Sequence, residues 1–200
     1  MSTSLKLATC GGDSLEIWKL PQKEKLLHWH HFSEGHTRAT WGKDGSTLAT
    51  FGAKKPDHFT ISYIKNDVCT SVEHLGPLGA GHSIRAIHYP RTSVKYPCIA
   101  VDDQVLLYDV AKKKSKVEFK NVQAVSCLAM NHNDKYIAAG TNLGKVHILN
   151  TGTSRSAFKN PIAIDSDRQA ADVVTSVNFN NIKYSMMGCS SDQGMILIKT

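Results

Sequence analysis

The chain has 200 residues, of which 41% are hydrophobic and 20% are charged, and this composition is typical of a water-soluble globular protein. No stretch approaches the roughly 18 consecutive apolar residues that a membrane-spanning helix needs, and the N-terminus lacks the apolar segment of a secretory signal. These features argue against a membrane protein and against a secreted one. The formal net charge of +7 favours acidic partners, such as an acidic protein, an anionic surface or nucleic acid.

The five cysteines are odd in number and widely scattered. No two of them stand in the Cys-X-X-Cys spacing of a zinc or redox site. We therefore expect reduced thiols in an intracellular protein, as small apolar side chains buried in strands, and neither a disulfide framework nor a metal site.

Strand patterns dominate the chain from its N-terminus onward. Apolar runs come in pairs, and each pair flanks a polar segment that contains turn-forming residues such as Gly, Asp, Asn or Pro, as in a β-hairpin. In chain order the five pairs are 5–10 with 15–20, 46–52 with 58–64, 96–101 with 105–110, 135–140 with 145–150, and 184–191 with 195–200.

Two further strands recur around these hairpins. An alternating strand and a polar turn lead into the hairpin within 36–52, 83–101, 124–140 and 173–189, and a shorter strand follows it at 25–32, 69–75, 115–120 and 154–159. Equivalent points lie about 40 to 50 residues apart, which is the period of a four-stranded propeller blade, and no helix-length pattern competes.

The repeat therefore predicts an all-β propeller, present as an incomplete ring of about four to five four-stranded antiparallel blades of a seven-bladed one. The expected boundaries are 1–34, 35–77, 78–121 and 122–162, with a partial blade at 163–200. The first blade lacks its leading strand and the last lacks its fourth. We expect further blades to complete the ring, because an open array leaves apolar sheet faces in water.

Several residues at fixed places in these units resemble the WD40 family. Gly81 and His82 stand ahead of the leading strand of the third unit, at 83–89, where the family carries Gly-His, and Asp102 lies in that unit's tight turn. Tyr108, followed by Asp109, stands where Trp-Asp closes a repeat, and Trp18 takes that place in the first unit. The resemblance implies a structural role for these residues.

The later units depart from the family pattern. Leu149 and Lys199 take the place of Trp, and Asn142 or Leu143 takes the place of the turn Asp. Asp13 and Asp192 lie in the hairpin turns of the first and last units, and the resemblance implies that they too are structural.

Within the family, the chain is most similar to the N-terminal propeller of the NEDD-type centrosomal WD-repeat proteins. The similarity rests on the opening LKLATCGGDSLEIW, on NDKYIAAGTNLGKVHILNT in the fourth unit and on VTSVNFNNIKYSMMGCSSDQGMILI in the fifth. It implies a non-catalytic scaffold that recruits γ-tubulin ring complexes to the centrosome and spindle microtubules for microtubule nucleation in mitosis. The implied partners are augmin and the γ-tubulin ring complex, the latter bound through a C-terminal region outside this chain.

Other functions find less support in the sequence. No Gly-X-Ser-X-Gly motif occurs, and the glycine-rich stretch 76–81 lacks the Gly-Lys-Ser/Thr of a phosphate loop, so we expect neither an enzyme nor a cofactor. His28, His30 and His31 have no nearby Cys or carboxylate set to complete a metal site. A substrate receptor of a ubiquitin ligase, or the scaffold of another intracellular complex, remains the alternative, although the Trp-Asp-X-Arg box of such receptors is absent.

Two lysine-rich stretches are the candidate protein-binding residues. Both fall between the third and fourth strands of their units, and such turns share one face of a propeller, whereas Lys54 and Lys55 belong to the opposite face. An acidic protein such as tubulin suits them better than nucleic acid, because no aromatic residues are interleaved with them. Ordinary solubilising lysines would show the same pattern. The candidates are Lys23, Lys25, Lys112, Lys113, Lys114 and Lys116.

Overall fold

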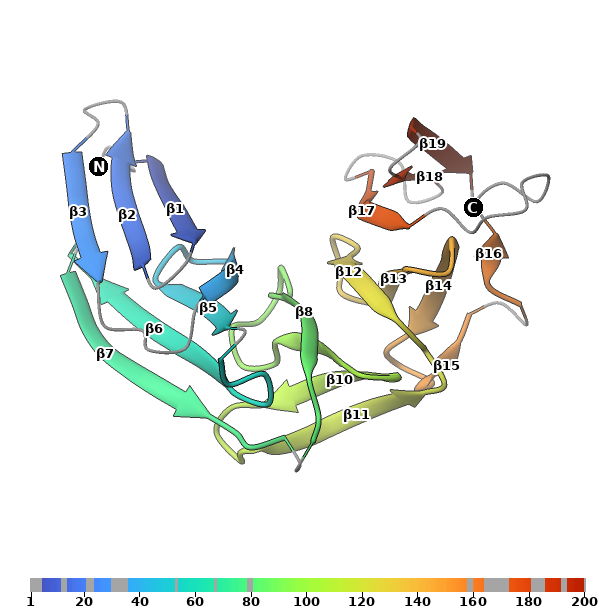
Figure 1. Cartoon of the computed structure of the whole chain (residues 1–200), viewed down its shortest axis with the longest axis horizontal. Helices are drawn as coiled ribbons and strands as arrows, with labels where there is room; N and C mark the ends of the chain where they lie inside the picture. Colours follow the sequence, from blue (N-terminus) through green and yellow to red (C-terminus); the bar gives the residue numbers. More distant parts are fainter. Residues whose placement is uncertain are drawn as a thin grey trace. The chain divides into compact units, whose positions relative to one another are not determined.

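The computed structural model confirms the all-β expectation: its described residues form nineteen strands, in antiparallel sheets, and no helix (Figure 1). The described residues are 5–11, 14–20, 24–29, 36–52, 54–66, 68–78, 81–157, 160–163, 173–180, 186–191 and 194–199. The chain divides into two compact units, Met1–Ile84 and Arg85–Thr200, which we describe separately.

The first unit contains two sheets. One has three strands in the order β1-β2-β3, and the other has four in the order β4-β5-β6-β7. Their bounds are β1 (Leu5–Gly11), β2 (Ser14–Leu20), β3 (Glu24–Trp29), β4 (His36–Trp41), β5 (Thr47–Gly52), β6 (Phe59–Lys65) and β7 (Val68–Leu75).

The second unit contains three sheets. The first has the order β11-β10-β9-β8, the second β12-β13-β14-β15 with β16 added beside β14, and the third β17-β18-β19. Their bounds are β8 (Ile84–His88), β9 (Cys98–Val101), β10 (Gln104–Asp109), β11 (Lys114–Lys120), β12 (Val125–Met130), β13 (Tyr136–Thr141), β14 (Lys145–Asn150), β15 (Arg155–Ser156), β16 (Ile162–Ala163), β17 (Val174–Phe179), β18 (Met186–Ser191) and β19 (Gly194–Lys199).

The sheets share their irregularities as well as their order. The outer strand pair slips by one residue at Ile17/Trp18, at Tyr63/Ile64 and at Leu107/Tyr108. The leading pair slips in the same way at His36/Arg38, Val125/Cys127 and Val174/Ser176. Because a β-bulge needs one extra residue at a defined place in the strand, this recurrence shows that the sheets are copies of one structural unit.

Two sequence predictions differ from the structure in detail. Of the strand expected at 154–159, the structure assigns β15 alone, and residues 158 and 159 lie outside the described residues. Ala157 still donates its N–H to the carbonyl of Ile148, and β16 pairs with the other end of β14. Pro161, between the two short strands, has no N–H to donate. The predicted lysine-rich turn is also shorter, since β11 begins at Lys114.

Apolar faces hold the sheets together within each unit. In the first, Leu15 and Ile17 of β2 pack with Leu48 and Ile64 of the next sheet, and Trp41 lies partly buried against them. Full burial of such a side chain stabilises the fold by about 1.5–3 kcal/mol.

The second unit has two apolar clusters. One joins β8–β11 to β12–β14 and the other joins β12–β14 to β17 and β18. Cys98, Cys127 and Cys189 are buried in these strands as free thiols, which confirms the expected apolar role, whereas Cys10 and Cys69 are partly exposed.

Candidate protein interaction surface

The turn between β10 and β11 presents the densest run of positive charge. Asp109, at the end of β10, is buried, and its Oδ1 accepts the backbone N–H of Lys112 at 3.0 Å. The N–H of Lys113 points back to the carbonyl oxygen of Val110 at 3.4 Å, and Lys113 takes a left-handed φ of 51°. These contacts fix the backbone of a tight turn from which Lys112, Lys113 and Lys114 project, all three exposed.

The long loop between β8 and β9 runs beside this turn. Tyr108 donates its N–H to the carbonyl of Pro97 at 3.0 Å, and Val110 donates to Lys95 at 3.2 Å. Lys116, the extra residue of the bulge in β11, places its Nζ over the ring of Tyr96, 4.0 Å from the ring centre. Loop and hairpin therefore form one surface.

Asp134 attaches the same loop to the neighbouring sheet. It lies in the β12–β13 turn with a φ of 56°, and its carboxylate accepts the N–H of Arg91 at 2.9 Å and the N–H of Thr92 at 2.6 Å, as well as the Thr92 hydroxyl. Its own carbonyl accepts the hydroxyl of Thr151 at 2.9 Å. Hydrogen bonds to a carboxylate, such as those from Arg91 and Thr92, stabilise a fold by about 1.5–3 kcal/mol each.

We call the surface formed by these turns the basic end. Its cations are all exposed. Of its two carboxylates, that of Asp109 is buried at 7% exposure, and that of Asp134 is partly exposed but accepts the N–H groups of the loop. Asp102 and Asp103 lie in the β9–β10 turn, which an antiparallel sheet places at its opposite end. The cations of the basic end are Arg91, Lys95, Lys112, Lys113, Lys114, Lys116 and Lys135.

His88, on β8, lies close enough to Asp134 and Arg91 of the basic end for their charges to affect its pKa. Burial lowers the pKa of its imidazole, Asp134 opposes that effect, and Arg91 adds to it. His88 is therefore biased toward the neutral form, because burial disfavours the charged one.

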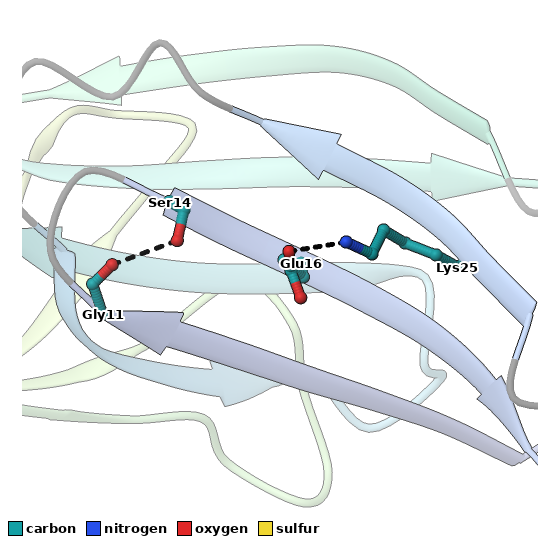
Figure 2. Close-up of polar contacts among 4 residues, drawn as sticks. All are labelled: Gly11, Ser14, Glu16 and Lys25. Carbon is teal, nitrogen blue, oxygen red and sulfur yellow. Dashed lines mark hydrogen bonds and ion pairs between the residues drawn. The ribbon is translucent and has the colours of Figure 1, made fainter.

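Lys25, in the first unit, has close partners of its own. Its Nζ forms an ion pair with Oε1 of Glu16 at 2.8 Å (Figure 2) and stands 4.9 Å from the ring centre of Trp18. Figure 2 also shows the hydroxyl of Ser14 donating to the carbonyl of Gly11 at 3.1 Å. Lys25 thus contacts two side chains of its own sheet. Lys23, the other candidate lysine of this unit, lies outside the described residues.

The residues that resemble the WD40 motif lie in turns and strands of the sheets, and their structural role stays a prediction. Asp102 lies in the β9–β10 turn with a φ of 49°, and Tyr108 is buried in β10. His82 is half-buried just before β8, and Trp18 lies half-buried on β2. Asp13 and Asp192 fall outside the described residues.

Two hollows mark the described surface. A shallow groove of about 390 Å³ crosses β1 and β2, and Leu7, Trp18 and Leu20 give it an apolar lining. A second hollow of about 320 Å³ lies between β11 and the β14–β15 hairpin, near Lys120, Arg155 and His147. Burial, and to a smaller extent Lys145, lowers the pKa of His147.

The described part of the chain brings together no group of three or more His, Cys, Asp or Glu side chains that could hold a metal ion. It also forms no helix of the length and apolar character needed to cross a membrane.

The sequence predicted the lysines of the β10–β11 turn as candidates. It did not point to Arg91, Lys95, Lys135 or the carboxylate of Asp134, which the structure adds to the basic end. Three of these lie in polar loops that carry no distinct motif. The Asn-Asp pair at 133–134 signals a turn, but nothing local shows that the carboxylate reaches a loop 42 residues earlier.

Comparison with known proteins adds one similarity. The chain is 23% identical to human protein NEDD1 over 201 aligned positions, which cover 99% of this chain and 29% of NEDD1. The chain therefore spans less than a third of the length of this relative. No family model matches the chain.

Proposed function

We propose that this chain is a non-catalytic protein-interaction scaffold of the WD-repeat type. The observation that carries the proposal is the repetition of one bulged antiparallel sheet along the chain, combined with similarity to a WD-repeat relative over 99% of its length. Repeated sheets of this kind present their turns side by side, which is a geometry suited to docking partners. Fold alone does not fix a function, so the partner has to be tested.

The partner that the similarity favours is the machinery of microtubule nucleation. The centrosomal proteins that the sequence resembles target γ-tubulin ring complexes to the centrosome and the mitotic spindle. We propose the same role here, in the cytoplasm and on the cytoskeleton. This chain would supply the contact with an adaptor such as augmin, while a region outside it binds the ring complex.

The candidate contact residues are the lysines of the β10–β11 turn and β11. Lys112, Lys113 and Lys114 are exposed on a fixed turn, and Lys116 is held beside Tyr96. Lys25 is a weaker candidate, because Glu16 already neutralises it.

The test is a capture experiment with purified components. The chain is immobilised and offered recombinant augmin and, separately, γ-tubulin ring complex. We expect retention of augmin, and weak or no retention of the ring complex by this chain alone. If the folded chain retains neither, the proposed role is wrong. Retention of ubiquitin-ligase subunits in a parallel arm would favour the substrate-receptor alternative.

A further inference from the structure

We propose that the basic end binds an extended, carboxylate-rich segment of a protein partner. The inference deepens the proposed function, since it rests on the chain acting as a protein scaffold and names the chemistry of the segment that it holds.

Charge is the first argument. Residues 85–157 carry eleven Lys and Arg against five Asp and Glu. Seven of these cations belong to the basic end and are exposed, while both of its carboxylates, on Asp109 and Asp134, accept backbone N–H groups. Glu118 lies two residues beyond Lys116 and accepts the hydroxyl of Ser115. The surface that a partner meets is therefore positive.

The second argument is the rigidity of the backbone that carries these cations. Asp109 closes the β10–β11 turn, Asp134 fixes the loop that carries Arg91 and Lys95, and Thr151 donates to the carbonyls of Asp134 and Lys135. Because the turns are already ordered, binding costs little backbone entropy, which favours affinity.

The arrangement of the cations defines the shape of the ligand. They come from three separate turns on two adjacent sheets, so a single small anion can meet only part of the set. An extended segment with several carboxylates can contact cations on each turn, and each contact is a modest one of the kind that exposed ion pairs make.

Nucleic acid fits this surface less well than an acidic peptide. Binding of single strands relies on aromatic rings that stack on bases. At the basic end, Tyr96 is covered by the Lys116 ammonium, Tyr89 is buried, and Tyr136 packs into the core between sheets. None of these three rings belongs to a fully exposed residue.

The experiment measures binding of a fluorescent oligoglutamate peptide to the full chain by anisotropy. The test variant is Lys112→Glu/Lys114→Glu, and the matched control is Lys120→Glu/Lys145→Glu, which reverses two exposed cations at the opposite end of the same sheets. We expect binding to weaken about tenfold in the test variant and less than about twofold in the control. We also expect it to weaken steadily as salt rises, because exposed charges are screened. Unchanged thermal unfolding verifies that both variants fold.

Three results would overturn the inference: no binding by the wild-type chain, equal loss in both variants, or tighter binding of a single-stranded oligonucleotide that depends on Lys112 and Lys114. The assay contains neither augmin nor γ-tubulin. If the chain binds the peptide but does not capture augmin, the proposed function alone is refuted. If the test variant captures augmin as well as the wild-type chain does, the inference alone is refuted.

Discussion

The carboxylate of Asp134 accepts the backbone N–H of Thr92 across 42 residues of sequence, at 2.6 Å. This bond, together with the parallel one from Arg91, joins the β8–β9 loop of one sheet to the β12–β13 turn of the next. It also sets the place from which the side chains of Arg91 and Lys95 leave the backbone. One carboxylate thus serves both the packing of two sheets and the layout of the basic end.

Replacing Asp134 by Asn should destabilise the fold by about 1–3 kcal/mol. Asn tolerates the left-handed backbone at this position, but its amide has one acceptor oxygen where the carboxylate has two, so one loop N–H loses its partner. Urea unfolding measures the loss. Asp103→Asn, which removes the same charge from an exposed turn, should change stability by less than about 0.5 kcal/mol. Equal losses of stability in the two variants would show that the charge matters and that the hydrogen bonds from Arg91 and Thr92 do not.

Gly140 leaves no room for a side chain between β13 and β17. A Cβ placed there would lie 2.5 Å from Cγ1 of Val174 and 2.7 Å from Sγ of Cys127. Gly140→Ala should therefore destabilise the second unit by about 1–3 kcal/mol through overpacking. Gly188→Ala, whose Cβ meets nothing within 4 Å, serves as the control in the same thermal unfolding experiment. A Gly140→Ala protein as stable as the control would contradict the packing of these sheets.

Stability should fall as the pH is lowered below the ordinary imidazole pKa of 6.5. Burial lowers the pKa of His88 in the folded state, and that of His147 likewise, so the unfolded chain binds protons more readily in this range. The stability that the neutral rings provide is complete above that pH and is lost below it, by at most about 1.4 kcal/mol per pH unit for each ring.

Urea unfolding at pH 7.5 and at pH 5.5 checks this pH dependence, and His88→Gln should reduce the difference between the two. The carboxylates of Asp44 and Asp57, whose pKa values are lowered, lose their contribution only as the pH falls below their ordinary value of 3.8. An unchanged pH profile in the His88 variant would exclude this residue as the cause.

Thiol reactivity should separate the five cysteines into two groups. Cys10 and Cys69 are partly exposed, while Cys98, Cys127 and Cys189 are buried. Burial raises the thiol pKa of Cys10 and Cys69 as well as those of Cys98 and Cys189, so access of the reagent separates the two groups. Because a thiol must reach the reagent as its thiolate to react, a colorimetric thiol reagent at pH 7.5 should modify the two partly exposed residues first and the other three only on unfolding. Rapid labelling of all five in the native protein would contradict the buried core.

Much of the fold follows from local sequence. The run at 145–150 alternates apolar and polar residues after a Thr-Asn-Leu-Gly turn, and the structure places β14 at Lys145–Asn150. Period-two patterning and turn chemistry act within a few residues, so the hairpins could be read directly. The recurrence of those hairpins then gave the four-stranded antiparallel unit.

The features that could not be predicted from the sequence depend on contacts between residues far apart along the chain. β15 is short because β14 pairs with both β15 and β16 along the same edge. The bulge at Lys116 is visible only in the register of β11 against β10. The role of Asp134 depends on a loop whose amino acids give no sign of a carboxylate partner. The candidate lysines could be predicted from their clustering in the sequence, whereas the surface that they share could be found only in the structure.

The localisation of a fluorescently tagged chain in dividing cells tests the central claim most directly. We predict that the wild-type chain concentrates at spindle poles and that Lys112→Glu/Lys114→Glu, expressed at the same level and equally stable, becomes diffuse while the Lys120→Glu/Lys145→Glu control does not. A wild-type chain spread evenly through the cytoplasm would contradict the centrosomal role, and a test variant that still concentrates at the poles would contradict the part assigned to the basic end.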